Sequence, residues 1–135
     1  MVSVSEVLRV IMDDKSLSLF NTIALMREDN DVLTNKLGLT RKQYYSRISH
    51  LKKAHLIKTK NRSHHLTSFG IVVYKAQKLI ESGVQEYWKL GIIDSIESGE
   101  NTVGIPTDER KRIIDRLIDK EEVKDILLNH NPATN

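Results

Sequence analysis

Cysteine is absent from this chain of 135 residues, so neither a disulfide framework nor a thiolate metal site can form. Long apolar runs are absent too, because no stretch approaches the roughly 18 residues that a membrane-spanning helix needs. The first six residues lack the basic segment and apolar core of a secretory signal, and we expect none. Together these absences favour a protein that works in the cytoplasm, without a membrane partner.

Acidic residues are missing from a long internal stretch. Between Asp31 and Glu81 there is no Asp or Glu, although the whole chain has 18 acidic residues. The same stretch holds eleven basic residues: Lys36, Arg41, Lys42, Arg47, Lys52, Lys53, Lys58, Lys60, Arg62, Lys75 and Lys78. Clustered cations favour a polyanion as partner, because they displace the counterions condensed on its phosphates. The alternative is a solvated helix face that happens to be basic.

Motifs for catalysis and for metal binding are lacking as well. There is no glycine-rich phosphate loop, no nucleophile with a nearby base and no pair of carboxylates beside the basic stretch. His64 and His65 invite a metal interpretation, because imidazole is the commonest metal ligand. Adjacent residues on a strand point to opposite faces, however, and no carboxylate lies nearby. We therefore expect no enzyme, no cofactor and no metal.

Helical periodicity is clear at the start of the chain. Apolar residues at helical spacing predict one helix over residues 4–11 and a second over residues 17–24. Asp14 or Ser16 is the expected N-cap of the second helix. A third, brief helix should end at Gly38, because glycine accepts the left-handed conformation that a helix C-terminus commonly needs.

The strongest helix prediction begins at Arg41 and runs to about Ala54. Thr40 is its expected N-cap, and Gln43 lies three residues on, which is the spacing of a capping box. Its apolar stripe consists of Tyr44, Ile48 and Leu51. Two helices joined by a tight, glycine-containing turn form a helix-turn-helix, whose second helix enters the major groove of DNA.

A two-stranded ribbon is predicted directly after this helix. Leu56–Lys60 is compatible with a strand, Asn61–Ser63 is a turn, and His64–Thr67 can return as a second strand. A ribbon in this position is the wing of a winged helix. Lys58, Lys60 and Arg62 lie on or near its tip. They favour contact with DNA, although edge strands also carry Lys simply to block strand-to-strand aggregation.

A long helix is predicted from Ser68 to about residue 96, with Gly83 and Gly91 as weak points that could bend or break it. A helix of ~27 residues would be about 40 Å long at 1.5 Å per residue. This exceeds what a winged-helix core requires, so part of the apolar stripe needs another partner and we predict a homodimer. The predicted dimerisation residues are Val73, Ala76, Ile80, Val84, Tyr87 and Trp88.

The rest of the chain is predicted as a small helical extension. Beyond a polar linker, Pro106 opens one short helix, and a second carries residues 123–127. The chain thus divides into a helix-turn-helix core (1–67), a long helix (68–97) and a linker with C-terminal helices (98–135).

The segment Leu39–Ile57 resembles the recognition segment of winged-helix regulators of the ArsR and MarR types. The run Leu66–Tyr74 is similar to the LT-x-x-G pattern with which their next helix begins. Taken together, the chain looks most like small archaeal winged-helix proteins known as predicted transcriptional regulators. The resemblance covers residues 30–76 well and residues 77–96 more loosely. His55 stands where most relatives have glycine, and we expect the left-handed bend there to be kept.

The resemblance implies which residues contact DNA. Expected contacts on the recognition helix are Arg41, Lys42, Gln43, Tyr45, Ser46, Arg47 and His50. We expect Arg47 to lie on an exposed surface, and the Tyr45 ring could either stack in the interface or lie along the neighbouring helix. Expected phosphate and wing contacts are Lys36, Lys58, Lys60, Arg62 and His64. Arg and Lys read guanine edges and Gln reads adenine, whereas phosphate contacts position the protein without specifying sequence.

We therefore predict a mainly α-helical winged helix-turn-helix protein with a two-stranded wing. Its predicted function is to bind specific sequences of double-stranded DNA as a homodimeric transcriptional regulator. One alternative is a protein-binding winged helix in a transcription or chromatin assembly, and another is nonspecific, architectural DNA binding. Tyr74, Tyr87 and Trp88 could line an effector pocket, but aromatics at helical spacing are more often core or interface.

Overall fold

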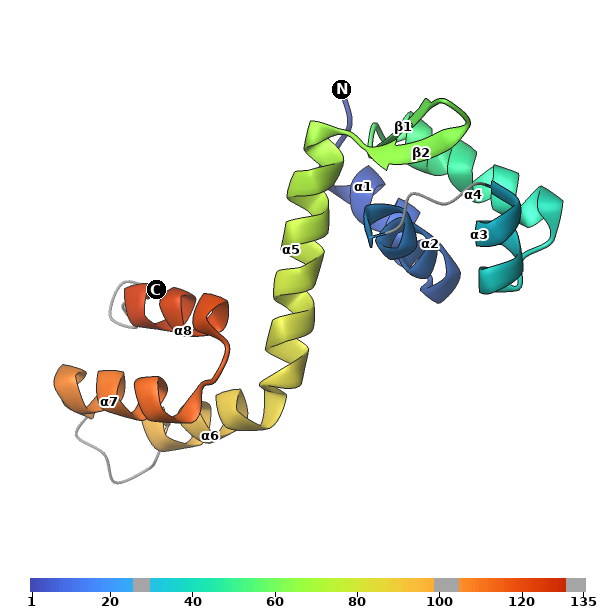
Figure 1. Cartoon of the computed structure of the whole chain (residues 1–135). Coiled ribbons are helices and arrows are strands. Elements are labelled where there is room, and N and C mark those ends of the chain that lie inside the picture. Colours follow the sequence, from blue (N-terminus) through green and yellow to red (C-terminus); the bar gives the residue numbers. More distant parts are fainter. Residues whose placement is uncertain (26–29, 99–104, 131–135) are drawn as a thin grey trace. The chain divides into compact units, whose positions relative to one another are not determined.

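The computed structural model describes residues 1–25, 30–98 and 105–130 (Figure 1). This described part is mainly helical and contains a single two-stranded antiparallel sheet, which is compatible with a helical fold that carries a wing. The chain forms two compact units, Met1–Ala76 and Gln77–Asn135, which we call the N-terminal and C-terminal units. No helix in the described ranges has both the length and the apolar character needed to cross a membrane.

In its described residues, the N-terminal unit has four helices, a hairpin and the start of a fifth helix. The elements are α1 (Val4–Ile11), α2 (Asp14–Leu25), α3 (Asn30–Leu37), α4 (Arg41–Lys53), β1 (Ile57–Lys60), β2 (Ser63–Leu66) and α5 (Ser68–Gln85). The second half of α5 belongs to the C-terminal unit. Gly38 has a φ of 62°, so the left-handed end predicted for α3 is confirmed.

Side-chain caps set the starts of α2 and α4. The predicted capping box of α4 is present, because the Gln43 N–H donates to Thr40 Oγ1 at 3.1 Å and the Thr40 N–H donates to Gln43 Oε1 at 3.0 Å. The predicted cap of α2, Asp14 or Ser16, is wrong. Asp13 Oδ1 instead accepts the Ser16 N–H at 2.9 Å, which makes Asp13 the capping residue.

One hydrophobic core joins the elements of the N-terminal unit. The predicted stripe of α4 is buried in it, and Phe20 and Leu19 of α2 are fully buried beside it. The buried members are Val7, Ile11, Leu19, Phe20, Ile23, Leu33, Leu39, Tyr44, Ile48, Leu51, Ala54, Leu56 and Ile57. Because one side of α4 is committed to this core, its other sides are presented outward.

The β1–β2 hairpin follows α4 directly (Figure 1). Its register pairs Ile57 with Leu66, Lys58 with His65, Thr59 with His64 and Lys60 with Ser63. Successive pairs face opposite sides of the sheet, so His64 and His65 lie on different faces. At the tip, Asn61 and Arg62 have φ values of 52° and 65°. Two consecutive left-handed residues are the geometry of a tight, two-residue hairpin turn.

The junction between α4, the hairpin and α5 is held by the run Leu66–Gly70. Thr67 Oγ1 donates to the His55 carbonyl at 2.6 Å and accepts the Gly70 N–H at 2.9 Å, so Thr67 caps α5. A Cβ on Gly70 would lie 2.0 Å from the Leu56 carbonyl oxygen, so only glycine fits there. His55 has a φ of 61°, which confirms the left-handed bend predicted between α4 and β1.

The C-terminal unit contains, in its described residues, the second half of α5 followed by α6 (Tyr87–Glu97), α7 (Thr107–Leu117) and α8 (Glu121–Asn129). Its buried core consists of Ile93, Ile114, Ile118 and Val123. The two predicted C-terminal helices are present. The predicted single helix over residues 68–97 is wrong, because the chain breaks between α5 and α6 at Glu86, rather than at Gly83 or Gly91.

Glu86 accounts for the position of this break. Its side chain is buried, and Oε1 accepts the backbone N–H groups of Asp119 and Lys120, both at 2.9 Å. Lys89 Nζ lies 3.5 Å from Glu86 Oε2 and 2.6 Å from Asp119 Oδ2. The N–H of Lys120, helped by that of Asp119, holds the pKa of the Glu86 carboxyl below its usual range. The carboxylate thus ties the α5–α6 junction to the start of α8.

Candidate nucleic-acid interface

Helix α4 presents a polar side that lacks negative charge. Its buried stripe faces the core, and helical periodicity turns the residues between the stripe positions outward. The predicted contacts that are exposed on α4 are Arg41, Lys42, Gln43, Tyr45, Ser46 and His50. No residue of α4 is acidic, so this side of the helix attracts anions.

Two of these side chains are oriented by contacts within the protein. Gln43 Oε1 accepts the Thr40 N–H, so the amide nitrogen of Gln43 is the group left for an outside acceptor. The Tyr45 ring lies edge-on to the buried Tyr44 ring, with centroids 5.4 Å apart. Tyr45 is still 47% exposed. Its ring therefore has a defined position and an open face for stacking.

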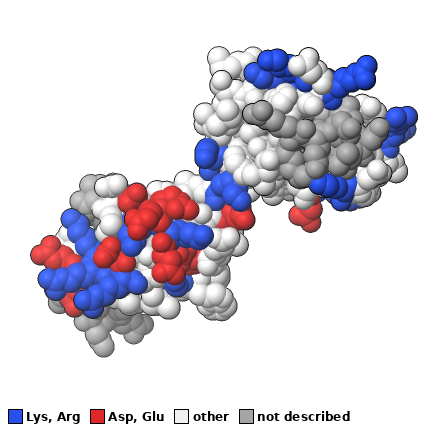
Figure 2. Space-filling model, viewed as in Figure 1, with Lys and Arg blue, Asp and Glu red and all other residues white. Residues whose placement is uncertain are grey.

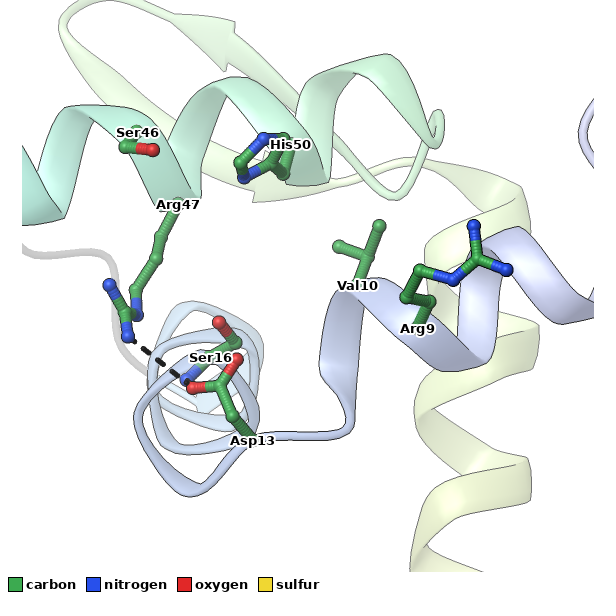
Figure 3. Close-up of a pocket in the computed structure, with 7 residues that line it drawn as sticks. All are labelled: Arg9, Val10, Asp13, Ser16, Ser46, Arg47 and His50. Carbon is green, nitrogen blue, oxygen red and sulfur yellow. Dashed lines mark hydrogen bonds and ion pairs between the residues drawn. The ribbon is translucent and has the colours of Figure 1, made fainter.

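Arg47 differs from the other predicted contacts, and the expectation that it lies on an exposed surface is wrong. Its side chain is only 26% exposed, and Nη2 lies 3.5 Å from Asp13 Oδ1 (Figure 3). Its Nε is buried without a hydrogen-bond partner in the described structure. The reason is its position beside Ile48, at the edge of the buried stripe. Arg47 therefore links α4 to the start of α2.

His64 also differs from the prediction, which placed it at the phosphates. Its imidazole is only 5% exposed, Nδ1 lies 3.1 Å from Thr59 Oγ1, and the ring centroid is 6.3 Å from that of Tyr44. Burial, with smaller effects from the charges of Lys52 and His65, holds the pKa of His64 below its ordinary value of 6.5. His64 is thus a buried residue that packs near Tyr44, and the partly exposed imidazole of the hairpin belongs to His65.

The remaining predicted cations are exposed. Lys58 and Lys60 project from β1, Arg62 lies at the hairpin tip, and Lys36 lies in the last turn of α3. Residues 1–76 contain 13 basic and 6 acidic residues, a net charge of +7, whereas residues 77–135 contain 8 basic and 12 acidic residues, a net charge of −4. On the face drawn in Figure 2, the N-terminal unit shows blue side chains with little red, and the C-terminal unit shows both colours mixed.

The predicted dimerisation residues fall into two groups. Val73 is half-buried and packs against the core of the N-terminal unit, so it is already covered within its own chain. The other five are exposed: Ala76, Ile80, Val84, Tyr87 and Trp88. Trp88 is 83% exposed and stacks edge-on with Tyr87. Tyr74, considered for an effector pocket, instead packs edge-on against Phe20.

A cavity beside α4 was missed from the sequence. Its lining residues are Arg9, Val10, Asp13, Ser16, Ser46, Arg47 and His50 (Figure 3). The α4 residues were singled out as DNA contacts, but nothing in the spacing of the α1 and α2 residues indicated that they meet α4. Only the packing of the three helices brings these side chains together.

No group of three His, Asp or Glu residues is placed to hold a metal ion in the part of the chain that the structure describes. No protein-family model matches the chain, and neither the curated proteins nor the solved structures contain a match. The likeness to ArsR- and MarR-type regulators therefore remains a prediction from the residues themselves.

Proposed function

We propose that this protein is a transcriptional regulator that binds specific sequences of double-stranded DNA through a winged helix-turn-helix in its N-terminal unit. The observation that carries this proposal is the exposed, acid-free side of α4 beside a hairpin with exposed cations at Lys58, Lys60 and Arg62. An α-helix fits the major groove, and a ribbon beside it reaches flanking phosphates or the minor groove. The net charge of +7 on residues 1–76 favours a polyanion.

The exposed residues suggest a division of roles. Lys42 and Gln43 offer hydrogen-bonding groups that can discriminate base edges in the major groove. Lys60 and Arg62 offer charges that suit phosphates, which hold the protein in register without reading sequence. Specificity would then come from α4, and the hairpin would contribute mainly to affinity.

A gel-shift experiment tests this proposal directly. The full chain is mixed with random genomic fragments at two salt concentrations, and the retained fragments are sequenced. Enrichment of a defined sequence at the higher salt supports specific regulation. Retention without sequence preference would instead favour the architectural alternative. The absence of any shift at either salt would refute DNA binding and favour an acidic protein partner for α4.

Two charge-removing variants separate the proposed roles. Lys42→Gln should cost about 1–3 kcal/mol on the enriched sequence and relax preference at one base position. Lys60→Gln should weaken binding evenly across sequences and shrink the slope of log K against log salt by about one unit. Lys111→Gln, an exposed change in the C-terminal unit, is the matched control. Identical effects of the first two variants on all sequences would contradict base reading by α4.

We also propose that two copies of the chain pair through the C-terminal unit. The supporting observation is a series of exposed apolar side chains along α5 and α6, Ile80, Val84, Tyr87 and Trp88, of which the last two are in ring contact; we call these four residues the apolar cluster. Large exposed apolar patches commonly mark protein–protein contacts. A two-fold dimer would present two copies of α4 to successive major grooves, about 34 Å apart along the DNA.

A further inference from the structure

A cavity of about 360 Å³ lies within the N-terminal unit between α1, α2 and α4 (Figure 3). Three elements contribute to its wall: Arg9 and Val10 from α1, Asp13 and Ser16 at the start of α2, and Ser46, Arg47 and His50 from α4. Val10 is the one apolar side chain in this wall. The cavity thus differs from the apolar core beneath it, since it collects hydrogen-bond donors and positive charge.

Arg47 has donors that its present partners do not use. Its closest ion pair, from Nη2 to Asp13 Oδ1, is 3.5 Å long, which is beyond the range of a strong charge-assisted hydrogen bond. Its Nε is buried and has no partner in the described structure. A guanidinium gains most when two parallel N–H groups meet an oxyanion, and Asp13 does not provide this arrangement.

Arg9 and His50 lie on the other side of the same cavity. Figure 3 shows the His50 ring and Val10 between the two arginines, with the Arg9 guanidinium pointing away from Asp13. Arg9 is exposed and makes no ion pair with any described residue. Its long side chain can turn towards the cavity by changing rotamer. Both guanidiniums and the imidazole can therefore converge on one ligand.

Asp13 is the one negative group in the cavity wall. The backbone N–H of Ser16 holds the pKa of the Asp13 carboxyl below its usual range, and the Arg47 charge adds to this effect. Asp13 therefore remains ionised and caps α2. The lining thus carries one negative charge and two guanidiniums, beside the positive end of the α2 dipole, which leaves the cavity with an excess of positive charge.

We propose that this cavity binds a small, doubly charged oxyanion, such as a phosphate group, through Arg9, Arg47 and His50. The Ser46 hydroxyl supplies a further donor from α4. The volume falls within the range of about 300–1,000 Å³ that small-molecule sites occupy, so the anion can be part of a larger ligand. Two sources share this chemistry: the phosphate of a free small molecule, or a phosphate of a nucleic-acid backbone bound beside α4.

Titration of the full chain with inorganic phosphate, at constant ionic strength in chloride and without DNA, tests the site. We expect saturable binding, seen as NMR shifts of the Arg9, Ser46 and His50 amides. Arg9→Gln and His50→Gln should each weaken binding by about tenfold, the loss of one charge-assisted contact. Lys53→Gln removes an exposed charge of α4 outside the cavity and should leave binding unchanged. No saturation, or equal weakening by all three variants, would overturn the proposal.

Asp13→Asn provides a test in the opposite direction. Asparagine still caps a helix, so the start of α2 is kept. The variant removes the negative charge that competes for Arg47, and phosphate should bind about tenfold more tightly. A poorly folded protein would not gain affinity, so this outcome cannot arise from damage to the fold. Unchanged or weaker phosphate binding by Asp13→Asn would contradict the proposed site.

Binding of a DNA duplex by the same variants then identifies the source of the phosphate. If Arg9→Gln weakens the binding of DNA and the binding of inorganic phosphate in parallel, the site holds a backbone phosphate. If the variant weakens only the binding of inorganic phosphate, the site takes a free small molecule. Both results support an oxyanion site. Because the phosphate titration contains no DNA, its failure is distinguishable from a failure of the proposed DNA binding.

Discussion

Gly70 lies where the first turn of α5 passes closest to the chain before β1. A Cβ there would meet the Leu56 carbonyl oxygen at 2.0 Å, so Gly70→Ala should force the backbone apart and lower the free energy of unfolding by about 2 kcal/mol or more. Gly83→Ala is the matched control in the same helix, because its Cβ would meet nothing within 4 Å. Gly83→Ala should raise the free energy of unfolding by about 0.5–1 kcal/mol. Urea denaturation measures the free energy of unfolding of both variants. Equal changes in Gly70→Ala and Gly83→Ala would contradict the close approach at Gly70.

The buried imidazole of His64 makes stability depend on pH. Its pKa in the folded protein lies below the ordinary value of 6.5, so unfolding takes up a proton when the pH is below 6.5 but above the folded-state pKa. The contribution of His64 to the free energy of unfolding is therefore largest above pH 6.5, and it is lost as the pH falls through the folded-state pKa. His64→Gln should flatten the change in the free energy of unfolding between pH 7.5 and 5.5. An unchanged profile in His64→Gln would show that another group is responsible.

At the scale of elements, Glu86 determines where α5 gives way to α6. Glu86→Gln removes the charge that the N–H groups of Asp119 and Lys120 stabilise, so both amides should exchange with solvent faster. Because the pKa of Glu86 is lowered in the folded protein, its contribution is present at neutral pH and is lost as the pH falls through that pKa. Amide hydrogen exchange measured by NMR checks this expectation. Glu109→Gln, on the exposed first turn of α7, is the control and should leave both amides protected.

At the scale of the whole molecule, the exposed cluster on α5 and α6 predicts self-association. Sedimentation equilibrium at micromolar concentration should give twice the chain mass of 15.5 kDa. Trp88→Glu places a charge in the cluster and should return the mass to that of one chain, because burying an unpaired charge is costly. Met12→Glu is the control, since Met12 is 77% exposed but lies in the N-terminal unit. A wild-type protein that remains at 15.5 kDa would refute the dimer.

Much of the N-terminal unit was predictable because its determinants are close together along the chain. The Thr40–Gln43 capping box and the left-handed Gly38 both depend on residues at most a few positions apart. The buried stripe of α4 follows from helical periodicity in the same way. The outward exposure of most predicted α4 contacts then follows, because these residues occupy the helix positions between the stripe residues.

Apart from the division of α5 from α6, the sequence by itself determined the order and type of the elements, since caps, turns and periodicity act over a few residues. Only the tertiary structure decided that Arg47 turns to Asp13, that His64 faces Tyr44, and that the helix breaks at Glu86. The physical reason is that each of these side chains is placed by a partner on another element, and the partners of Glu86 lie 33 and 34 residues further along the chain. The oxyanion cavity has the same origin, because three helices must pack before its charges meet.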